Sequence, residues 1–328
     1  MSLLKKLLPK IYAPDLFHTN LKRRRFFECW EHKLISNDGQ DILIVIGVLI
    51  LGKDRLCYNE IIDGKTGANY LVKYPIDQYK PSKTSMECQY ATTRFSKEGI
   101  DLSIKNDTLS INGKITFGEF KAFPSSKLSP GLMGYFSFIP FMESYFKLVS
   151  LHHSINGKIT INDKIYNFDK GSSYIEKGWG KKFPDSWLMI HCNTFTEPDT
   201  SFFVTFSPVK IIGTTIIGIQ CFIMYNNEII NFSTYNNGKI TLFKRLNKTL
   251  NIEIKNDTHY LDITVIPKKY GRIRIPSFRN RELFNLESSD STVYINLLKN
   301  NNIIKSFEGK NASFTFDEGI AGLIESKI

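Results

Sequence analysis

Short hydrophobic runs recur every eight to twelve residues along most of the chain, either alternating with polar residues or rich in β-branched side chains. Turns rich in Asn, Asp and Gly separate them, and stretches with the period of a helix are few. Strands are predicted over residues 100–104, 109–111, 114–117, 158–161, 234–235, 239–243, 250–254, 260–266, 292–298 and 313–316. This spacing is typical of sandwiches and barrels built from antiparallel strands. The pattern therefore predicts an all-β fold with few short helices.

Asn-Gly pairs mark three places along these runs. They are Asn112-Gly113, Asn156-Gly157 and Asn237-Gly238. Between two alternating runs, Asn-Gly is the strongest short-range signal of a two-residue hairpin, because both residues accept a positive φ. We expect a tight turn at each pair.

The length of 328 residues is about twice that of one ordinary compact domain. The number of predicted strands is likewise about twice that of one barrel. Two zones break the strand rhythm, residues 122–145 and residues 171–195, and long irregular segments in a β protein are often functional. We therefore expect two similar β domains, over residues 1–170 and 171–328.

The composition is that of a globular protein, with 42% hydrophobic and 13% aromatic residues. So many aromatic side chains can fill a large core and also suit walls that face an apolar ligand. The formal net charge of +11 predicts a surface that attracts anions. The lysines are scattered through Asn-rich turns, and none of the usual nucleic-acid-binding motifs is present. A generic basic surface is therefore favoured over a nucleic-acid interface.

The five cysteines are an odd number without a CxxC pair, which favours neither a disulfide framework nor a zinc site. They indicate a reducing compartment, so we predict a cytoplasmic location. The start of the chain lacks the apolar core of a signal peptide, since Lys5, Lys6 and Pro9 interrupt it. The longest apolar stretch, residues 42–51, is about half as long as a membrane-spanning helix, and we predict a buried strand there.

The first twelve residues form a basic amphipathic segment. Its apolar stripe and the neighbouring cations consist of Leu3, Leu4, Leu7 and Leu8 with Lys5, Lys6 and Lys10. Such a segment can rest on an anionic membrane, where lipid substrates reside, which would make the protein peripheral on that membrane. The alternative is a short helix packed on the β domain.

Most catalytic motifs are absent. The sequence has no GxSxG elbow, Walker loop or HExxH pair, and no GxGxxG that opens a helix, which argues against nucleotide-dependent transfer and zinc hydrolysis. Of the six histidines only His152 and His153 are adjacent, and neighbours in a strand point to opposite faces. We expect no metal site and no cofactor.

Two acids lie in aromatic surroundings and are candidates for proton transfer. Glu143 lies in the apolar run of residues 138–145, and Glu176 lies close to a tryptophan. A carboxyl group in apolar surroundings keeps its proton to higher pH, because the ionised form loses hydration, and it can then donate that proton. The structural alternative is that a cation such as Lys177 or Arg25 neutralises each acid.

The tryptophans also have two interpretations. Trp30, Trp179 and Trp187 are either core residues whose indole N–H groups find a carbonyl, or walls of a hydrophobic cavity. His191 and Asn193 lie two residues apart on a predicted strand, so we expect them to share a face that points into a cavity or out to water.

Four segments in the middle of the chain carry a resemblance to a known family. They are residues 129–143 (SPGLMGYFSFIPFME), 148–153, 174–184 (YIEKGWGKKFP) and 187–195. In fixed order they closely resemble the tocopherol cyclase family, and residues 24–30 and 307–309 resemble that family near the two ends of the chain. The similarity spans nearly the whole chain, and the central block is its specific part.

This resemblance implies two consecutive lipocalin-like antiparallel β-barrels or sandwiches that bind a hydrophobic small molecule. It also implies the cofactor-free closure of a prenylated quinol to a chromanol, in which an acid protonates an alkene and the phenol oxygen attacks the resulting cation. The resemblance makes Glu176 and Glu143 candidate proton donors, and His153 and His191 candidate proton relays. The candidate substrate-binding residues are Trp30, Tyr135, Tyr174, Trp179, Trp187 and Asn193.

The chain departs from the family pattern at several positions. Gly178 stands where members usually carry an acid, Thr194 where they carry a histidine, and Glu31 where they carry a tyrosine. Cys29 replaces a glycine, and residues 146–147 replace a His-Gly pair. Two hypotheses follow: an enzyme that cyclises a prenyl quinol or related isoprenoid, or a lipocalin-like carrier of a hydrophobic isoprenoid or lipid that has lost catalysis.

Overall fold

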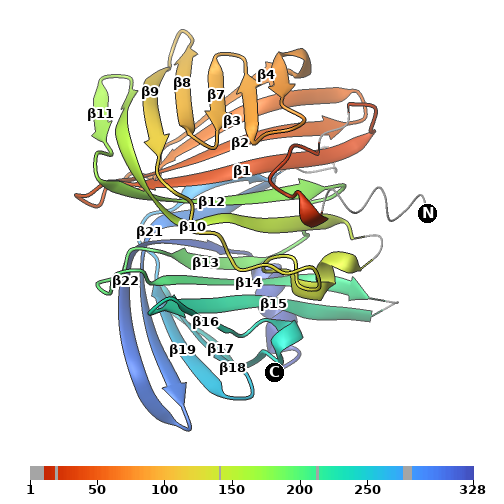
Figure 1. Cartoon of the computed structure of the whole chain (residues 1–328), viewed down its shortest axis with the longest axis vertical. Helices are drawn as coiled ribbons and strands as arrows, with labels where there is room; N and C mark the ends of the chain where they lie inside the picture. Colours follow the sequence, from red (N-terminus) through yellow and green to blue (C-terminus); the bar gives the residue numbers. More distant parts are fainter. Residues whose placement is uncertain (1–10, 19–20, 140–141, 212–213, 276–282) are drawn as a thin grey trace. The chain divides into compact units, whose positions relative to one another are not determined.

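The computed structural model describes residues 11–18, 21–139, 142–211, 214–275 and 283–328. They form two compact units, each with its own antiparallel sheet and hydrophobic core (Figure 1). Unit 1 comprises the described parts of Met1–Ile62, Asn69–Phe183 and Ile275–Leu283, and unit 2 comprises those of Asp63–Ala68, Pro184–Arg274 and Phe284–Ile328. The all-β fold predicted from the sequence is confirmed.

The sheet of unit 1 has twelve strands. They are β1 (Arg25–Ile35), β2 (Asp41–Leu51), β3 (Asp54–Asp63), β4 (Asn69–Pro75), β5 (Tyr79–Pro81), β6 (Glu87–Tyr90), β7 (Thr93–Ser96), β8 (Gly99–Lys105), β9 (Ser110–Phe117), β10 (Ser144–Ile161), β11 (Lys164–Asn167) and β12 (Gly171–Gly180). Their order is β4-β3-β2-β1-β12-β10-β9-β8-β7-β6-β5, and β11 pairs with β10. The first strand thus pairs with the last, with Phe27 opposite Gly180.

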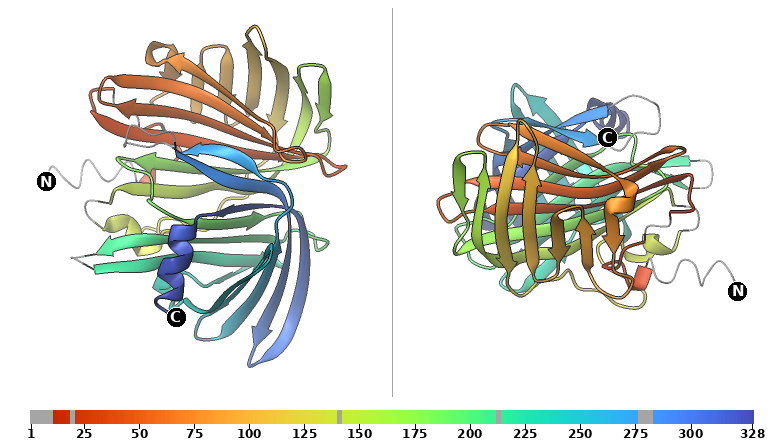
Figure 2. Two further views of the ribbon diagram at one scale, coloured as in Figure 1. Left: turned by 180° about the vertical axis from the view of Figure 1, so that it is seen from behind. Right: turned by 90° about the horizontal axis from the view of Figure 1, so that it is seen from above.

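The core of unit 1 lies on one face of a strongly curved sheet (Figures 1 and 2). In β2, Ile42, Ile44, Ile46 and Val48 belong to this core, and the residues between them face the other side. Nearly all of β2 is buried on both faces. A strand buried on both faces reads as a continuous apolar run, so the strand predicted over residues 42–51 is confirmed although its sequence does not alternate.

The sheet of unit 2 has ten strands. They are β13 (Leu188–Cys192), β14 (Ser201–Ile211), β15 (Thr214–Tyr225), β16 (Glu228–Asn231), β17 (Lys239–Leu246), β18 (Thr249–Lys255), β19 (His259–Ile266), β20 (Gly271–Ile275), β21 (Leu283–Lys299) and β22 (Asn302–Phe316). Their order is β16-β15-β14-β13-β22-β21-β19-β18-β17, and β20 pairs with β21. The first strand again pairs with the last, with His191 opposite Ser313. The two units therefore share one connectivity.

The described helical elements are short. Helix α2 (Glu318–Glu325) begins at Asp317, whose carboxylate accepts a hydrogen bond from the Gly319 N–H at 2.8 Å. It contacts β14 and β17 and buries Ile320, Ala321 and Ile324 in the core of unit 2. Three 3₁₀ turns are also described, and they are η1 (Ile76–Gln78), η2 (Gly134–Phe138) and η3 (Thr234–Asn236).

The main division between the units falls between Phe183 and Pro184. Strand β12 therefore completes unit 1, whereas the sequence pattern placed residues 171–183 in the second domain. The reason is pairing at long range, because β12 lies between β1 and β10 in the sheet. Hydrophobic period alone does not show which strands become neighbours.

Two of the three Asn-Gly pairs lie inside strands, so the hairpins predicted there are wrong. Gly113 lies within β9 and Gly157 within β10. A Cβ atom at Gly113 would lie 2.3 Å from the Lys158 carbonyl oxygen, and one at Gly157 would lie 2.0 Å from the Lys114 carbonyl oxygen. Glycine is needed at both positions because neighbouring backbones approach closely. The third pair does lie in a turn, where Asn237 adopts a φ of 58° at the end of η3.

Among the described residues, no helix has the length and apolar character needed to cross a membrane. The N-terminal segment predicted to contact a membrane or pack on the β domain falls outside the described residues, apart from Ile11 and Tyr12. The predicted cytoplasmic location stays a prediction.

Candidate functional site

Strand β12 places its side chains alternately on the two faces of the sheet of unit 1. Ile175 belongs to the core of this unit, and Lys177 is paired with the core residue Trp30, so Ile175, Lys177 and Trp179 lie on the core face. Tyr174, Glu176 and Gly178 lie on the opposite face. The sequence predicted that Glu176 and Trp179 would serve one cavity, but the structure separates them by the thickness of the sheet.

On the face opposite the core, three side chains form what we call the acid cluster: Glu31, Tyr174 and Glu176. Tyr174 is buried, and its hydroxyl donates a hydrogen bond to the Glu176 carboxylate. Burial raises the pKa of Glu176 to about 7, and the Tyr174 hydrogen bond opposes this shift. Near neutral pH a large part of the Glu176 carboxyl groups therefore carries a proton, and the role of Glu176 as a proton donor stays a prediction.

Glu31 lies directly opposite Glu176 in the pairing of β1 with β12. Directly opposed residues have Cβ atoms about 5 Å apart on the same face of the sheet. The pairing therefore brings two acidic residues to neighbouring positions on this face. Lys33, which is fully buried, lies opposite Tyr174 and brings a cation to the edge of the same cluster.

Position 178, where the family pattern has an acid, lies on this face as well. Gly178 is paired with Cys29, and the Cys29 thiol donates to the Gly178 carbonyl oxygen at 3.7 Å. A Cβ atom at position 178 would lie 3.6 Å from Phe27 Cε2 and 3.7 Å from Cys29 Sγ, which are ordinary contacts. The site therefore has room for a Cβ atom at position 178, and Glu31 lies diagonally across from it in the strand pairing.

The pKa of the Cys29 thiol is raised by burial first and then by the charges of Glu31 and Glu176. The thiol is thus kept protonated beside the acid cluster and is a poor nucleophile. This agrees with a cluster whose chemistry rests on carboxyl groups.

The core face of β12 carries a buried ion pair. Lys177 Nζ lies 2.7 Å from Glu28 Oε1, and both side chains are fully buried. The ammonium lies over the rings of Trp30 and Trp179, at 4.6 Å and 4.9 Å from their centroids. Burial lowers the pKa of Lys177, and the Glu28 carboxylate opposes that shift.

This ion pair holds the segment of residues 11–18, which we call the strap. Lys177 Nζ donates to the carbonyl oxygens of Pro14 at 3.0 Å and Leu16 at 2.6 Å. The backbone N–H of His18 donates to the Glu28 carboxylate at 2.8 Å. The pair therefore uses most of its hydrogen-bonding capacity to fix the strap, which is a structural role.

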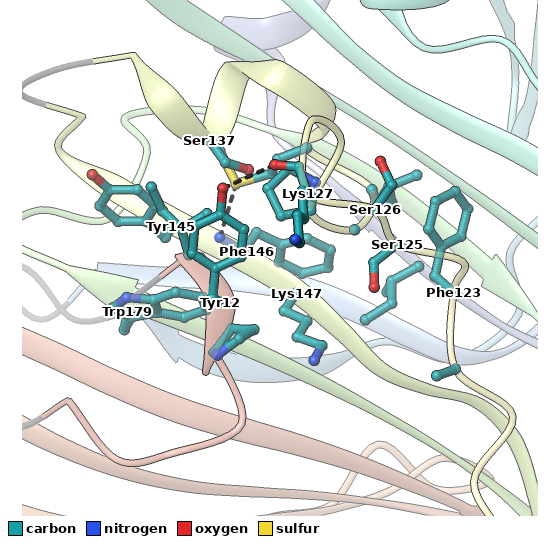
Figure 3. A pocket seen from close by; sticks show the side chains of 18 residues that line it. Tyr12, Phe123, Ser125, Ser126, Lys127, Ser137, Tyr145, Phe146, Lys147 and Trp179 are labelled. Atoms are coloured by element: carbon teal, nitrogen blue, oxygen red, sulfur yellow. Dashed lines mark hydrogen bonds between the residues drawn. The ribbon is translucent and has the colours of Figure 1, made fainter. Parts of the chain in front are cut away.

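A cavity of about 440 Å³ lies beside the strap in unit 1 (Figure 3). Tyr145 and Trp179 stack at one end, with ring centroids 5.7 Å apart, and Ser125 and Ser126 lie at the other. No Asp or Glu is among its eighteen lining residues. Trp179 thus lines the cavity and also belongs to a buried hydrophobic cluster, and its role in substrate binding stays a prediction.

Two predicted site residues of unit 1 have exposed side chains. Glu143 is exposed, and its carbonyl oxygen accepts a hydrogen bond from the Lys181 N–H at 2.7 Å. The dry surroundings expected for Glu143 are therefore wrong, because the apolar run around it includes a chain turn rather than a strand interior. Tyr135, in η2, is 53% exposed. Their assigned roles stay predictions.

Two others are buried on the core face. Trp30 is fully buried in the core of unit 1. His153 contacts the rings of Phe117 and Phe120, and its Nδ1 lies 2.9 Å from the Ser150 hydroxyl. Burial lowers the pKa of His153 to about 3, so the ring is neutral at ordinary pH. His153 and Glu176 lie on opposite faces of the sheet, which argues against a direct proton relay between them.

The remaining predicted residues belong to unit 2. His191 is buried on the face of β13 opposite the core, since its neighbours Ile190 and Cys192 are core residues. Asn193 is buried just beyond the end of β13, and Trp187 is half-buried just before its start. Their roles in binding stay predictions.

The sequence did not single out Glu28 as a partner of Lys177 or Glu31 as a partner of Glu176. Each pair joins residues far apart in sequence through the pairing of β1 with β12. The only signal in the sequence was that both acids lie in or beside the segment of residues 24–30, which resembles the family. Among the described residues, no group of three or more His, Cys, Asp or Glu side chains could hold a metal ion.

Comparison with known proteins agrees with the resemblance in the sequence. Residues 85–311 match a family model described as tocopherol cyclase-like. A probable chloroplastic tocopherol cyclase of Oryza sativa subsp. japonica is 30% identical over 63 residues, and a chloroplastic tocopherol cyclase of Zea mays is 32% identical over 62 residues. Each alignment covers 19% of this chain and 13% of the relative.

Solved structures show the same fold at low sequence identity. CghA with Sch210972 has a TM-score of 0.59 and 8% identity, with 90% of this chain and 89% of that chain covered. Kievitone hydratase from Nectria haematococca has a TM-score of 0.50 and 7% identity, with 89% of each chain covered. These likenesses concern the fold alone. Because the family model spans more than half of the sequence, the chain belongs to the tocopherol cyclase-like family.

Proposed function

We propose that this protein is a cofactor-free acid catalyst that closes a prenylated quinol or a related isoprenoid to a chromanol. One observation carries the proposal: Glu176 is partly buried beside Glu31 and Tyr174, and its pKa is raised to about 7. A carboxyl group that keeps its proton at neutral pH, yet is a stronger acid than water, suits protonation of an alkene. Membership of the tocopherol cyclase-like family supports the same reaction.

The proposed reaction needs no net proton. The Glu176 carboxyl proton is transferred to one alkene carbon, which forms a C–H bond and leaves a tertiary cation on the other carbon. The phenol oxygen then attacks that cation and forms the C–O bond. The phenolic proton returns to the Glu176 carboxylate, which restores the protonated acid for the next turnover.

Replacing Glu176 by Gln tests this proposal. The amide keeps the size of the side chain and its hydrogen bond to Tyr174 but has no acidic proton, so we expect chromanol formation to fall by about 100-fold or more. Product is measured by mass spectrometry after incubation with prenylated quinols of several chain lengths. Glu119→Gln, at an exposed acid of unit 1, is the matched control and should leave turnover unchanged.

A second variant separates the two acids that the sequence proposed. If Glu143→Gln abolishes turnover while Glu176→Gln does not, the proton donor is Glu143 and the proposal fails. We expect the opposite, because the Glu143 side chain is exposed.

The cavity of unit 1 favours a second candidate function, that of a carrier for a hydrophobic isoprenoid or lipid. Its aromatic walls suit an apolar ligand, and no Asp or Glu lines it. The missing acid at position 178 fits this alternative too. A carrier would bind prenyl quinols saturably and release them unchanged, whereas the proposed enzyme converts them.

A further inference from the structure

We propose that the cavity of unit 1 is a binding site for an amphiphile with an apolar chain and an anionic head, such as a carboxylate or phosphate. The inference deepens the carrier function above, because it adds the charge of the ligand, and it is independent of the acid cluster. It rests on the distribution of charge and apolar surface along the cavity wall.

The polar half of the cavity is cationic. Lys127 and Lys147 both line it with Ser125 and Ser126, whereas Ser137 lies on the side of Tyr145 (Figure 3). No Asp or Glu is among the lining residues, and the carboxylate that offsets Lys147 is that of Asp15 in the strap. Two ammonium groups and several hydroxyl donors around one space are the groups that bind carboxylate or phosphate oxygens.

Only one of these lysines has a carboxylate partner among the described residues. Lys147 forms an ion pair with Asp15 of the strap, and the Asp15 side chain is 49% exposed. No ion pair is found for Lys127 in the part of the chain that the structure describes. An anionic head group can therefore contact Lys127 directly and compete with the half-exposed Asp15 for Lys147.

The other half of the cavity is apolar. Met133 is buried there with Tyr145 and Trp179, and the buried residues Leu132 and Ile11 also line the cavity. The volume of about 440 Å³ is within the range of small-molecule sites. An amphiphile can pack its apolar chain on these rings and place its anionic head group at the lysines. A neutral isoprenoid would contact the rings but would leave the lysines without an anionic partner from the ligand.

The test is a direct binding measurement on the full chain. cis-Parinaric acid is a fluorescent long-chain carboxylate whose emission rises in apolar surroundings, and its methyl ester is the matched uncharged probe. We expect saturable binding of the acid, at least about tenfold tighter than that of the ester. Lys127→Gln and Lys147→Gln should each weaken binding of the acid several-fold and leave binding of the ester unchanged.

Lys83→Gln, at an exposed lysine of unit 1 outside the cavity, is the control for a general change of net charge and should have no effect. Dodecanoate and geranyl phosphate as competitors distinguish the two head groups, and displacement by either supports the inference. Equal affinity for acid and ester overturns it and leaves the carrier function standing. The inference also fails if neither competitor displaces the probe or if both lysine variants bind the acid normally. Glu176→Gln should bind the probe as the parent protein does, whatever its effect on turnover.

Discussion

Burial and one hydrogen bond set the protonation of the Glu176 carboxyl group. Loss of hydration raises its pKa, and the Tyr174 hydroxyl stabilises the ionised form and so opposes that rise. The result, a pKa of about 7, places the titration of Glu176 in the range where a proton donor at neutral pH must lie.

The rate of cyclisation should therefore depend on pH with a defined sign. Above a pKa of about 7 the proton has left Glu176, so we expect the rate to fall tenfold for each further pH unit and to level off below it. This fall in rate at alkaline pH is measured in a pH–rate profile with saturating substrate. A profile that stays flat from pH 6 to pH 9 would contradict the assignment of Glu176.

Restoring the family's acid gives a second prediction. Gly178→Glu adds a carboxyl group two residues from Glu176 on the same face, where a Cβ atom would make only ordinary contacts. A further negative charge should raise the pKa of Glu176, so the alkaline limb of the profile should shift to higher pH. Gly322→Glu, on α2 of unit 2, adds the same charge where nothing lies within 4 Å and should leave the profile in place.

Two buried histidines predict sensitivity to acid. Burial lowers the pKa of His32 and of His153 to about 3, from an ordinary value of 6.5. The folded protein keeps both rings neutral while the unfolded chain takes up protons, so stability should fall as the pH drops below about 6.5. His32→Leu should make the urea midpoint less dependent on pH between 6.5 and 4. If the urea midpoint of this variant depends on pH as strongly as that of the parent protein, His32 is not buried in the neutral form.

At the scale of the element, β12 is the strand on which both candidate sites depend. Its alternation presents Glu176 on one face and Lys177 on the other, so a shift of one residue in its pairing would exchange the two sets. The Lys177–Glu28 pair fixes this choice, because both groups are buried and each needs its partner.

Lys177→Met leaves Glu28 buried without its cation, and it also removes two hydrogen bonds to the strap. We expect a loss of about 3–5 kcal/mol in the free energy of unfolding, measured by urea titration. Early proteolytic cleavage in residues 11–18 should accompany it. Replacing Glu28 by Leu in the same chain removes the unpaired charge and should recover part of that loss. If the Lys177→Met variant is as stable as the parent protein, the structural role of the Lys177–Glu28 pair is contradicted.

The sequence predicted strands better than it predicted turns and faces. Runs such as residues 260–266 alternate locally, and such a pattern is visible without knowing the neighbouring strand. The hairpins predicted at Gly113 and Gly157 were wrong. Glycine occurs there because neighbouring backbones approach closely, and not because the chain turns. Glu31 and Glu28 were missed as partners because strand pairing, which a single sequence does not reveal, brings them to β12.

At the scale of the whole molecule, the length and the number of strands predicted two β units, and each described unit has a core of its own. The family resemblance was visible because its segments keep a fixed order over the middle of the chain, and the family match confirms it. The sequence did not show that the acid cluster and the cavity of unit 1 are separate sites. Unit 1 carries an acid cluster on the face of its sheet opposite the core and a cationic, aromatic cavity beside the strap.

The pairing of first and last strands has a consequence for how the polypeptide folds as it is synthesised. Strand β2 follows β1 directly in the sequence and can pair with one edge of it as soon as both are synthesised. The other edge of β1 pairs with β12, which is synthesised only after β2 to β11. Contacts between such distant segments slow folding and leave a strand edge open to wrong partners in the meantime. The β13–β22 pair repeats the delay in unit 2, so the nascent chain passes through two successive intervals in which aggregation competes with closure.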